Sequence, residues 1–137
     1  PLNVVPGTHT GPLYDHWHDG VYTGTVAPEV ETAHVERAIP VHGPAGSACL
    51  MHTRLLHGSA PNQSDRPRTL FISEYRAEDS KPLQVNHLPS PYDGEVVRGQ
   101  RTNRVRCSSY EMDYPEVPTT ASFFDQQDKD GRVRRAT

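Results

Sequence analysis

The chain has few of the residues that build large apolar surfaces. Hydrophobic residues make up 34% of its 137 residues, aromatic residues 7%, and its mean hydropathy is -0.73. No apolar run approaches the roughly 20 residues that a membrane-spanning helix needs, and the first residues show no signal-peptide pattern. We therefore expect a cytoplasmic protein without a membrane anchor, consisting of one domain at most and having a small core.

Cysteine is scarce, and the chain has no excess of positive charge. The spacing of the two cysteines, Cys49 and Cys107, is not typical of a zinc or redox site. Lys and Arg number 14 against 17 Asp and Glu, which gives a formal net charge of -3 and a pI near 6.2. This balance argues against nucleic acid or an anionic membrane as a partner.

Proline and glycine, by contrast, are frequent, with 13 and 10 residues. They interrupt the chain at short intervals, which leaves little room for long helices and favours an all-β fold of short strands joined by loops. Strands are expected over residues 2–5, 21–26, 34–41, 48–57 and 69–75, and one short helix is an alternative over residues 30–36. The later part of the chain is polar and richer in proline. We expect residues 1–84 to form the β core and residues 85–137 an extended wrapping tail, frayed over 125–137.

The segment from His57 to Arg68 carries the most chemical information. Apolar or β-favouring residues flank it on both sides, and residues 61–65 have turn chemistry, so the segment predicts a hairpin. If the strands pair about that centre, His57 lies across from Arg68. Ser59 then lies across from Arg66, and the strand period of two places these four side chains on one face.

The residue types on that face suit one kind of ligand. A neutral imidazole is the commonest protein ligand for a transition metal, and a guanidinium grips a carboxylate through two hydrogen bonds. An acidic small molecule would chelate a metal at His57 with one end and offer a carboxylate to Arg68 with the other, with Ser59 as an extra donor. This arrangement describes 2-oxoglutarate in non-haem iron oxygenases.

Several short segments, taken in order, resemble the C-terminal half of phytanoyl-CoA dioxygenase family proteins. They are VPGTH (5–9), GPLYDH (11–16), GPAGS (43–47), HGSAPN (57–62) and RPR (66–68). The resemblance implies a double-stranded β-helix (a cupin-like jelly roll), iron(II) and 2-oxoglutarate as cofactors, and hydroxylation of a small molecule. It also implies that His57 is the distal iron ligand, Arg68 the 2-oxoglutarate anchor and Ser59 an accompanying hydroxyl donor.

One part of that family's iron site is missing from this sequence. No His-x-Asp pair occurs in the 137 residues, and only His34 and Glu36 have the spacing of a His-x-Glu variant. We therefore expect a fragment of a longer oxygenase, folded as an incomplete barrel and inactive alone. The missing strands would come from an absent N-terminal half or from a second copy of the chain.

His16 and His18 form an alternative metal site, because two histidines two residues apart on a strand share a face. The competing interpretation is a surface loop packed over Trp17, and the family resemblance implies that this loop lies near the mouth of the active site. Two further function classes stay open: a non-catalytic jelly-roll module without a complete metal site, and a hydrolase or other metalloenzyme that uses His16 and His18. His52, five residues before His57, is expected on the opposite strand face and outside the iron site.

Overall fold

The computed structural model describes residues 1–86, 90–109 and 111–114, and most of these residues lie in loops. The regular elements are short, and with η for a 3-10 helix they are β1 (Leu2–Val4), η1 (Thr8–Thr10), β2 (Trp17–His18), β3 (Val21–Tyr22), α1 (Pro28–His34), η2 (Val35–Arg37), β4 (Ile39–Val41) and β5 (His57–Ser59). The expected frayed end over residues 125–137 lies outside the described residues. Within the described ranges, no helix has the length and apolar character needed to cross a membrane.

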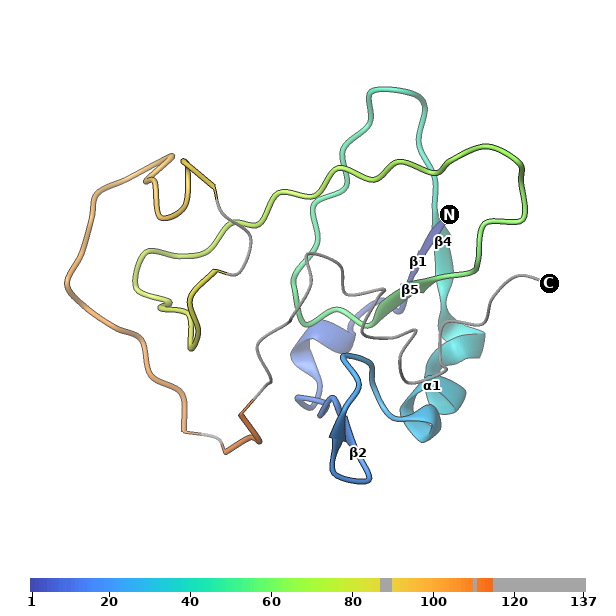
Figure 1. The fold of residues 1–137 in the computed structure, drawn as a ribbon, viewed down its shortest axis with the longest axis horizontal. Coiled ribbons are helices and arrows are strands. Elements are labelled where there is room, and N and C mark those ends of the chain that lie inside the picture. The colour runs from blue at the N-terminus through green and yellow to red at the C-terminus, as the bar shows by residue number, and fades with distance from the viewer. Residues whose placement is uncertain (87–89, 110, 115–137) are drawn as a thin grey trace.

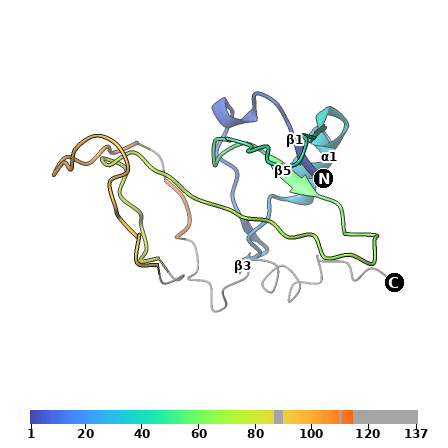
Figure 2. The same cartoon turned by 90° about the horizontal axis from the view of Figure 1, so that it is seen from above.

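Three strands form an antiparallel sheet with β1 at its centre (Figure 1 and Figure 2). Val4 of β1 pairs with Ile39 of β4 on one side and with His57 of β5 on the other. Directly opposed residues of an antiparallel pair share a face of the sheet. The sheet therefore places His57 beside the first strand of the chain, from which it is far removed in sequence.

The apolar core of the described residues is small, as the composition predicts. Val4 and Val5 are its buried hydrophobic side chains. Many larger apolar side chains are exposed instead, and Leu50 and Phe71 keep 95% and 90% of their surface accessible. In the described part of the chain the elements form a small sheet and one helix, and no barrel is closed.

Three of the expected strands near the N-terminus are present in shorter form. The strand expected over residues 2–5 is confirmed as β1, and the one expected over 34–41 is reduced to β4 because a helix occupies its first part. Residues 21–26 contribute only β3, which pairs with β2 in a hairpin. Asp19 and Gly20 form the turn of this hairpin with positive φ angles of 53° and 77°, and an Asp-Gly pair is favoured there because such turns match the twist of the strands.

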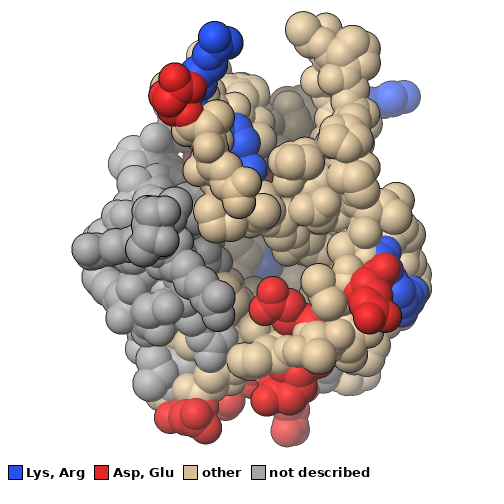
Figure 3. Space-filling model, turned by 90° about the vertical axis from the view of Figure 1, so that its right-hand side faces the viewer, with Lys and Arg blue, Asp and Glu red and all other residues tan. Residues whose placement is uncertain are grey.

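Local chemistry explains why a helix forms at α1. Pro28 occupies the first turn, where its missing N–H costs no hydrogen bond. Glu29 and Glu31 near the N-terminus and His34 in the last turn suit the helix dipole. Figure 3 shows Asp and Glu side chains gathered on the lower part of the face of the molecule that includes this helix. The 3-10 helix η2 follows α1 directly, so the next strand begins only at Ile39.

The hairpin expected about Asn62 does not form. Neither residues 48–56 nor residues 69–75 are strands, and β5 pairs with β1 instead of with the chain after the turn. A strand persists only where its backbone groups find a hydrogen-bonding partner. Among the described residues, the first segment has such contacts with the start of the chain only at its end, at Leu56, and no backbone bond is made by residues 69–75. The turn itself is confirmed, because the Asn62 side chain accepts a hydrogen bond from the Ser64 N–H and donates one to the Arg66 carbonyl.

A second hydrogen-bonded region spans residues 76–106, on the left of Figure 1. The Arg106 guanidinium donates to both Asp79 carboxylate oxygens at 2.6 and 3.2 Å, and the Arg106 N–H donates to the Asp79 carbonyl at 2.8 Å. This hydrogen bonding holds the pKa of Asp79 below its ordinary value and raises the pKa of Arg106. Part of the expected tail, residues 85–137, therefore returns to the end of the expected core.

Candidate functional site

His57 begins β5 and its side chain is exposed. The ring Nδ1 lies 2.8 Å from the Leu55 carbonyl, and because a carbonyl only accepts, Nδ1 must donate. The neutral ring then carries its lone pair on Nε2. Metal-binding histidines are typically held by this kind of hydrogen bond from the other nitrogen, and His57 makes such a hydrogen bond.

Arg68 and Ser59 meet next to His57. Ser59 follows His57 by two residues in β5, so the two side chains share a strand face. The Arg68 Nη2 donates to the Ser59 Oγ at 3.2 Å. The predicted face of the sheet is therefore partly present, but its register is wrong: Arg68 lies against Ser59 and not across from His57, because residues 69–75 form no strand that would impose the hairpin ladder.

Arg68 has no acidic partner in the part of the chain that the structure describes. The ion pairs there join Lys81 to Glu78 and Arg106 to Asp79. A surface arginine is often paired with a carboxylate of its own protein. Because Arg68 contacts a neutral hydroxyl instead, its charge and most of its donors remain available to an external carboxylate.

Thr8 connects the start of the chain to the residue before His57. This buried side chain donates from Oγ1 to the Val5 carbonyl at 2.8 Å and accepts from the Leu56 N–H at 2.9 Å. The Val5 N–H in turn donates to the Leu56 carbonyl at 2.9 Å. Thr8 was not among the predicted site residues, although it lies in the VPGTH segment that carries the family resemblance. It is a positioning residue for the strand of His57.

Replacing Thr8 by Val keeps the shape and removes the hydroxyl. The Leu56 N–H then loses its acceptor, and we expect the free energy of unfolding to fall by about 1–3 kcal/mol. Urea unfolding of both proteins measures the difference. Thr10→Val is the matched control, because the exposed Thr10 hydroxyl donates only to the Gly7 carbonyl of the same turn. An equal loss in both variants would contradict the bridging role.

His16 and His18 each make contacts close to the β2–β3 hairpin. The His18 Nε2 donates to the Thr25 carbonyl at 2.8 Å, whereas the His16 ring packs 6.3 Å from the ring of Tyr22, centroid to centroid. Asp15 turns its carboxylate back to accept a hydrogen bond from the Trp17 N–H at 2.9 Å. The side chains of His16, His18 and Asp15 thus make contacts within their own segment. Such contacts are what the competing interpretation, a surface loop packed over Trp17, would give.

The partial burial of His16 predicts a pH dependence of stability. Burial lowers the pKa of His16 below its ordinary value of 6.5, Asp15 opposes this shift, and His18 adds to it. The folded state thus favours the neutral ring, so the stabilisation is complete above the ordinary pKa and is lost as the pH falls below it. Urea midpoints measured between about pH 5 and 8 should decline less steeply on acidification in His16→Gln than in the unmodified chain. Parallel curves would contradict this.

Among the described residues, His34 and Glu36 make no contact with a common partner. The His34 Nδ1 donates to the Val30 carbonyl at 2.9 Å, and its Nε2 lies 3.5 Å from the Tyr14 hydroxyl, so both ring nitrogens are engaged. Glu36 lies exposed in η2. The two residues therefore face no common metal position, and His34 instead holds the end of α1 against the segment of Tyr14.

The described residues contain no group of three His, Cys, Asp or Glu side chains that could hold a metal ion. His52, the competing ligand, packs against His9 with the ring centroids 5.7 Å apart, and its Nδ1 accepts from the Arg54 N–H.

Comparison with known proteins confirms the family resemblance that the short motifs indicated. Residues 1–70 match the phytanoyl-CoA dioxygenase (PhyH) family. The chain belongs to this family. Its members are iron- and 2-oxoglutarate-dependent dioxygenases, and the matched range includes the predicted site residues His57, Ser59 and Arg68.

A curated relative from Stutzerimonas stutzeri is described as a "probable alpha-ketoglutarate-dependent hypophosphite dioxygenase". It is 33% identical to this chain over 107 residues, which cover 74% of the chain and 37% of the relative. The chain thus spans little more than a third of that dioxygenase. No solved structure matches the chain.

Proposed function

We propose that this chain provides the distal half of an iron(II)- and 2-oxoglutarate-dependent dioxygenase site that hydroxylates a small molecule. In this proposal His57 is one iron ligand, and Arg68 with Ser59 binds the distal carboxylate of 2-oxoglutarate. Family membership supports the reaction class. The observation that carries the assignment is the contact between Arg68 and Ser59 on the strand of His57.

The residues present fit one ligand position of the iron site and not a complete one. A facial site needs two histidines and a carboxylate, and the described residues supply no such set of three. His57 fits because its Nδ1–H is fixed on the Leu55 carbonyl and Nε2 is left for the metal. The other two ligands would come from outside this chain's recognisable motifs.

The chain's own residues would bind and orient the cosubstrate. Bound iron(II) supplies the activation of dioxygen that couples decarboxylation of 2-oxoglutarate to hydroxylation of the substrate. The Arg68 fork donates two parallel hydrogen bonds to a carboxylate. The Ser59 hydroxyl, which accepts from Arg68, keeps its own proton to donate to the same carboxylate. Together they would bind the distal carboxylate of 2-oxoglutarate. His57 would hold the iron to which the other end of 2-oxoglutarate binds.

The double-stranded β-helix of the family would be completed by strands from elsewhere, either an upstream half of the same protein or a second copy. β4 and β5 are the outer strands of the sheet, and apolar side chains in the loops before and after β5 are exposed. They include Leu50, Leu70, Phe71 and Ile72, with exposed fractions of 95%, 67%, 90% and 69%. New strands beside these segments would pair their backbones and bury that surface. We retain residues 1–84 as the core part and 85–137 as the wrapping part of this fold.

An anaerobic titration with iron(II) and 2-oxoglutarate tests the proposed function. The chain is measured alone and then joined to the upstream part of its own domain, and the readout is the visible charge-transfer band of the chelate. We expect the band in the completed domain and little or none in the 137-residue chain. Absence of the band from a folded completed domain would refute the proposal and favour the non-catalytic jelly-roll module.

The substrate named for the Stutzerimonas stutzeri protein is an anion. We do not propose it for this chain, because the loop that the family resemblance places near the mouth of the active site carries the carboxylate of Asp15. A carboxylate at that position repels an anionic substrate.

A further inference from the structure

Three hydrogen bonds connect the ring of His57 to the start of the chain. The His57 Nδ1–H donates to the Leu55 carbonyl at 2.8 Å. The Leu56 N–H donates to Thr8 Oγ1 at 2.9 Å, and the Thr8 hydroxyl donates to the Val5 carbonyl at 2.8 Å. We call these three bonds the Thr8 relay. It joins the proposed iron ligand to a side chain that lies 48 positions before Leu56.

The first two bonds of the relay are made by one peptide unit. The Leu55 carbonyl and the Leu56 N–H belong to the same peptide group, whose atoms are held in a plane by its partial double bond. A rotation that turned the Leu56 N–H away from Thr8 would therefore turn the Leu55 carbonyl away from His57 by the same angle. The acceptor on one side of this peptide thus fixes the hydrogen bond on its other side.

The direction of each bond follows from the groups that make it. A carbonyl only accepts, so His57 donates from Nδ1, and the Thr8 hydroxyl gives its single proton to Val5. The lone pairs of the Thr8 oxygen then accept the Leu56 N–H. All three bonds run in one sense, and hydrogen bonds in such a chain polarise and strengthen one another.

Burial and the neighbouring bonds make Thr8 the group that sets this peptide plane. Thr8 is 8% exposed, so little water competes with it for the Leu56 N–H. The Leu55 N–H donates to the His52 carbonyl, and the Leu56 carbonyl accepts from the Val5 N–H, both at 2.9 Å. The peptide groups before and after the Leu55–Leu56 unit are therefore also held by hydrogen bonds.

We propose that Thr8 is a positioning residue that selects the tautomer of His57 through the Leu55–Leu56 peptide. A neutral histidine side chain free in water favours the proton on Nε2, whereas the relay keeps it on Nδ1 and leaves the lone pair on Nε2. Hydrogen bonds to the far nitrogen of a metal-binding imidazole fix its tautomer in this way. That Nε2 receives iron rests on the proposed function, whereas the tautomer is a property of the chain without metal.

NMR of the ring nitrogens tests the tautomer in the 137-residue chain without metal. The spectrum is recorded in mildly alkaline buffer, in which imidazole rings are neutral, and comparison with His57→Ala identifies the His57 signals. We expect the proton on Nδ1 and slow hydrogen exchange of the Leu56 N–H. These two measurements need no Thr8 variant. A proton mainly on Nε2, or a Leu56 N–H that exchanges as fast as an exposed one, overturns the proposal.

Three variants separate the hydroxyl from the shape of the side chain. Thr8→Val keeps the shape without the hydroxyl, and we expect the His57 ring to change mainly to the Nε2–H form. Thr8→Ser keeps the hydroxyl and should keep the Nδ1–H form. Thr10→Val is the matched control and should also keep it, because the exposed Thr10 hydroxyl donates to the Gly7 carbonyl and takes no part in the relay.

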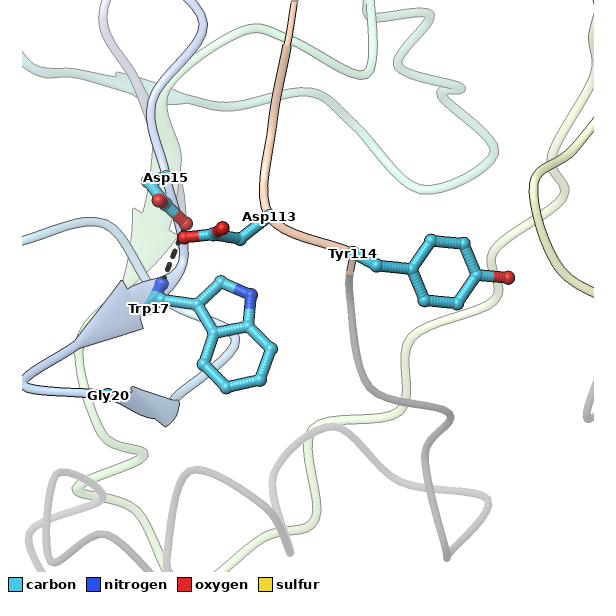
Figure 4. Close-up of a pocket in the computed structure, with 5 residues that line it drawn as sticks. All are labelled: Asp15, Trp17, Gly20, Asp113 and Tyr114. Atoms are coloured by element: carbon cyan, nitrogen blue, oxygen red, sulfur yellow. Dashed lines mark hydrogen bonds between the residues drawn. The ribbon is translucent and has the colours of Figure 1, made fainter.

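Trp17, the single tryptophan of the chain, reports whether each variant is folded. It lines a pocket of about 480 Å³ beside the β2–β3 hairpin (Figure 4), and no residue of the relay is among the other lining residues, which are Asp15, Gly20, Asp113 and Tyr114. A change confined to the relay should therefore leave the Trp17 emission as it is, whereas unfolding should alter it.

Iron(II) binding is measured separately in the completed domain. There Thr8→Val should weaken iron(II) about tenfold, as loss of a group that orients a metal ligand typically does, and Thr8→Ser should restore the affinity. An unchanged Nδ1–H ring in folded Thr8→Val overturns the proposal, whatever the iron affinity. A tautomer that changes in Thr8→Val, in a completed domain that gives no iron chelate band, would leave the relay and remove the proposed function.

Discussion

Replacing His57 by Ala is expected to weaken iron(II) binding to the completed domain by more than about 100-fold, because a direct metal ligand is lost. The structure gives the physical reason, since the Nδ1–H on the Leu55 carbonyl leaves Nε2 as the ligand atom. Anaerobic titration with iron(II) in the presence of 2-oxoglutarate measures the effect. Activity should disappear together with the chelate band.

His52→Ala is the matched control for that experiment. Both histidines are exposed, but the Nδ1 of His52 accepts from the Arg54 N–H, so its neutral ring carries the proton on Nε2. Its ring also packs against His9, away from β5. We expect iron affinity close to that of the unmodified protein. If His52→Ala loses iron and His57→Ala retains it, the ligand assignment is wrong.

Replacing Arg68 by Ala is expected to raise the Kd of 2-oxoglutarate about 100-fold while iron(II) binding is largely kept. A bidentate, charge-assisted contact with a carboxylate is lost, and no described residue offers a second guanidinium on Ser59. Arg68→Lys keeps the charge without the planar fork, so its affinity should fall between the two. Titration of the iron(II) protein with 2-oxoglutarate distinguishes the three proteins.

Two further variants make the Arg68 result specific. Ser59→Ala removes one neutral hydroxyl and should weaken 2-oxoglutarate binding by about tenfold or less. Arg66→Ala removes a neighbouring positive charge whose residue contacts Asn62 only through its backbone carbonyl. If Arg66→Ala weakens 2-oxoglutarate as much as Arg68→Ala, general positive charge and not the predicted anchor explains the affinity.

Local features of the fold were predictable because they depend on neighbours within a few residues. Asn62 forms its turn through hydrogen bonds to Ser64 and Arg66. Pro28 starts a helix that His34 ends. The strand β1 was also expected at almost its observed bounds. Each of these depends on turn chemistry, capping or β-branched side chains that the sequence displays directly.

Strand pairing could not be predicted in the same way. The composition of residues 69–75 favours a strand, but a strand also needs a partner backbone, and none of the described residues pairs with it. β5 instead pairs with β1, from the other end of the matched region. The 3-10 helix η2 at Val35–Arg37 likewise shortened the strand expected over residues 34–41. In each case the available backbone partners, and not the local sequence, decided the outcome.

The sequence by itself determined the family, the residue types of the candidate site and the turn that separates Ser59 from Arg68. These are carried by short contiguous motifs, whose chemistry does not depend on distant parts of the chain. Only the tertiary structure decided that Arg68 meets Ser59, that Thr8 holds Leu56, and that Trp17 shares a pocket with Asp113. Such contacts join residues separated in sequence, and they are selected by which backbone and side-chain groups find partners when the whole chain packs.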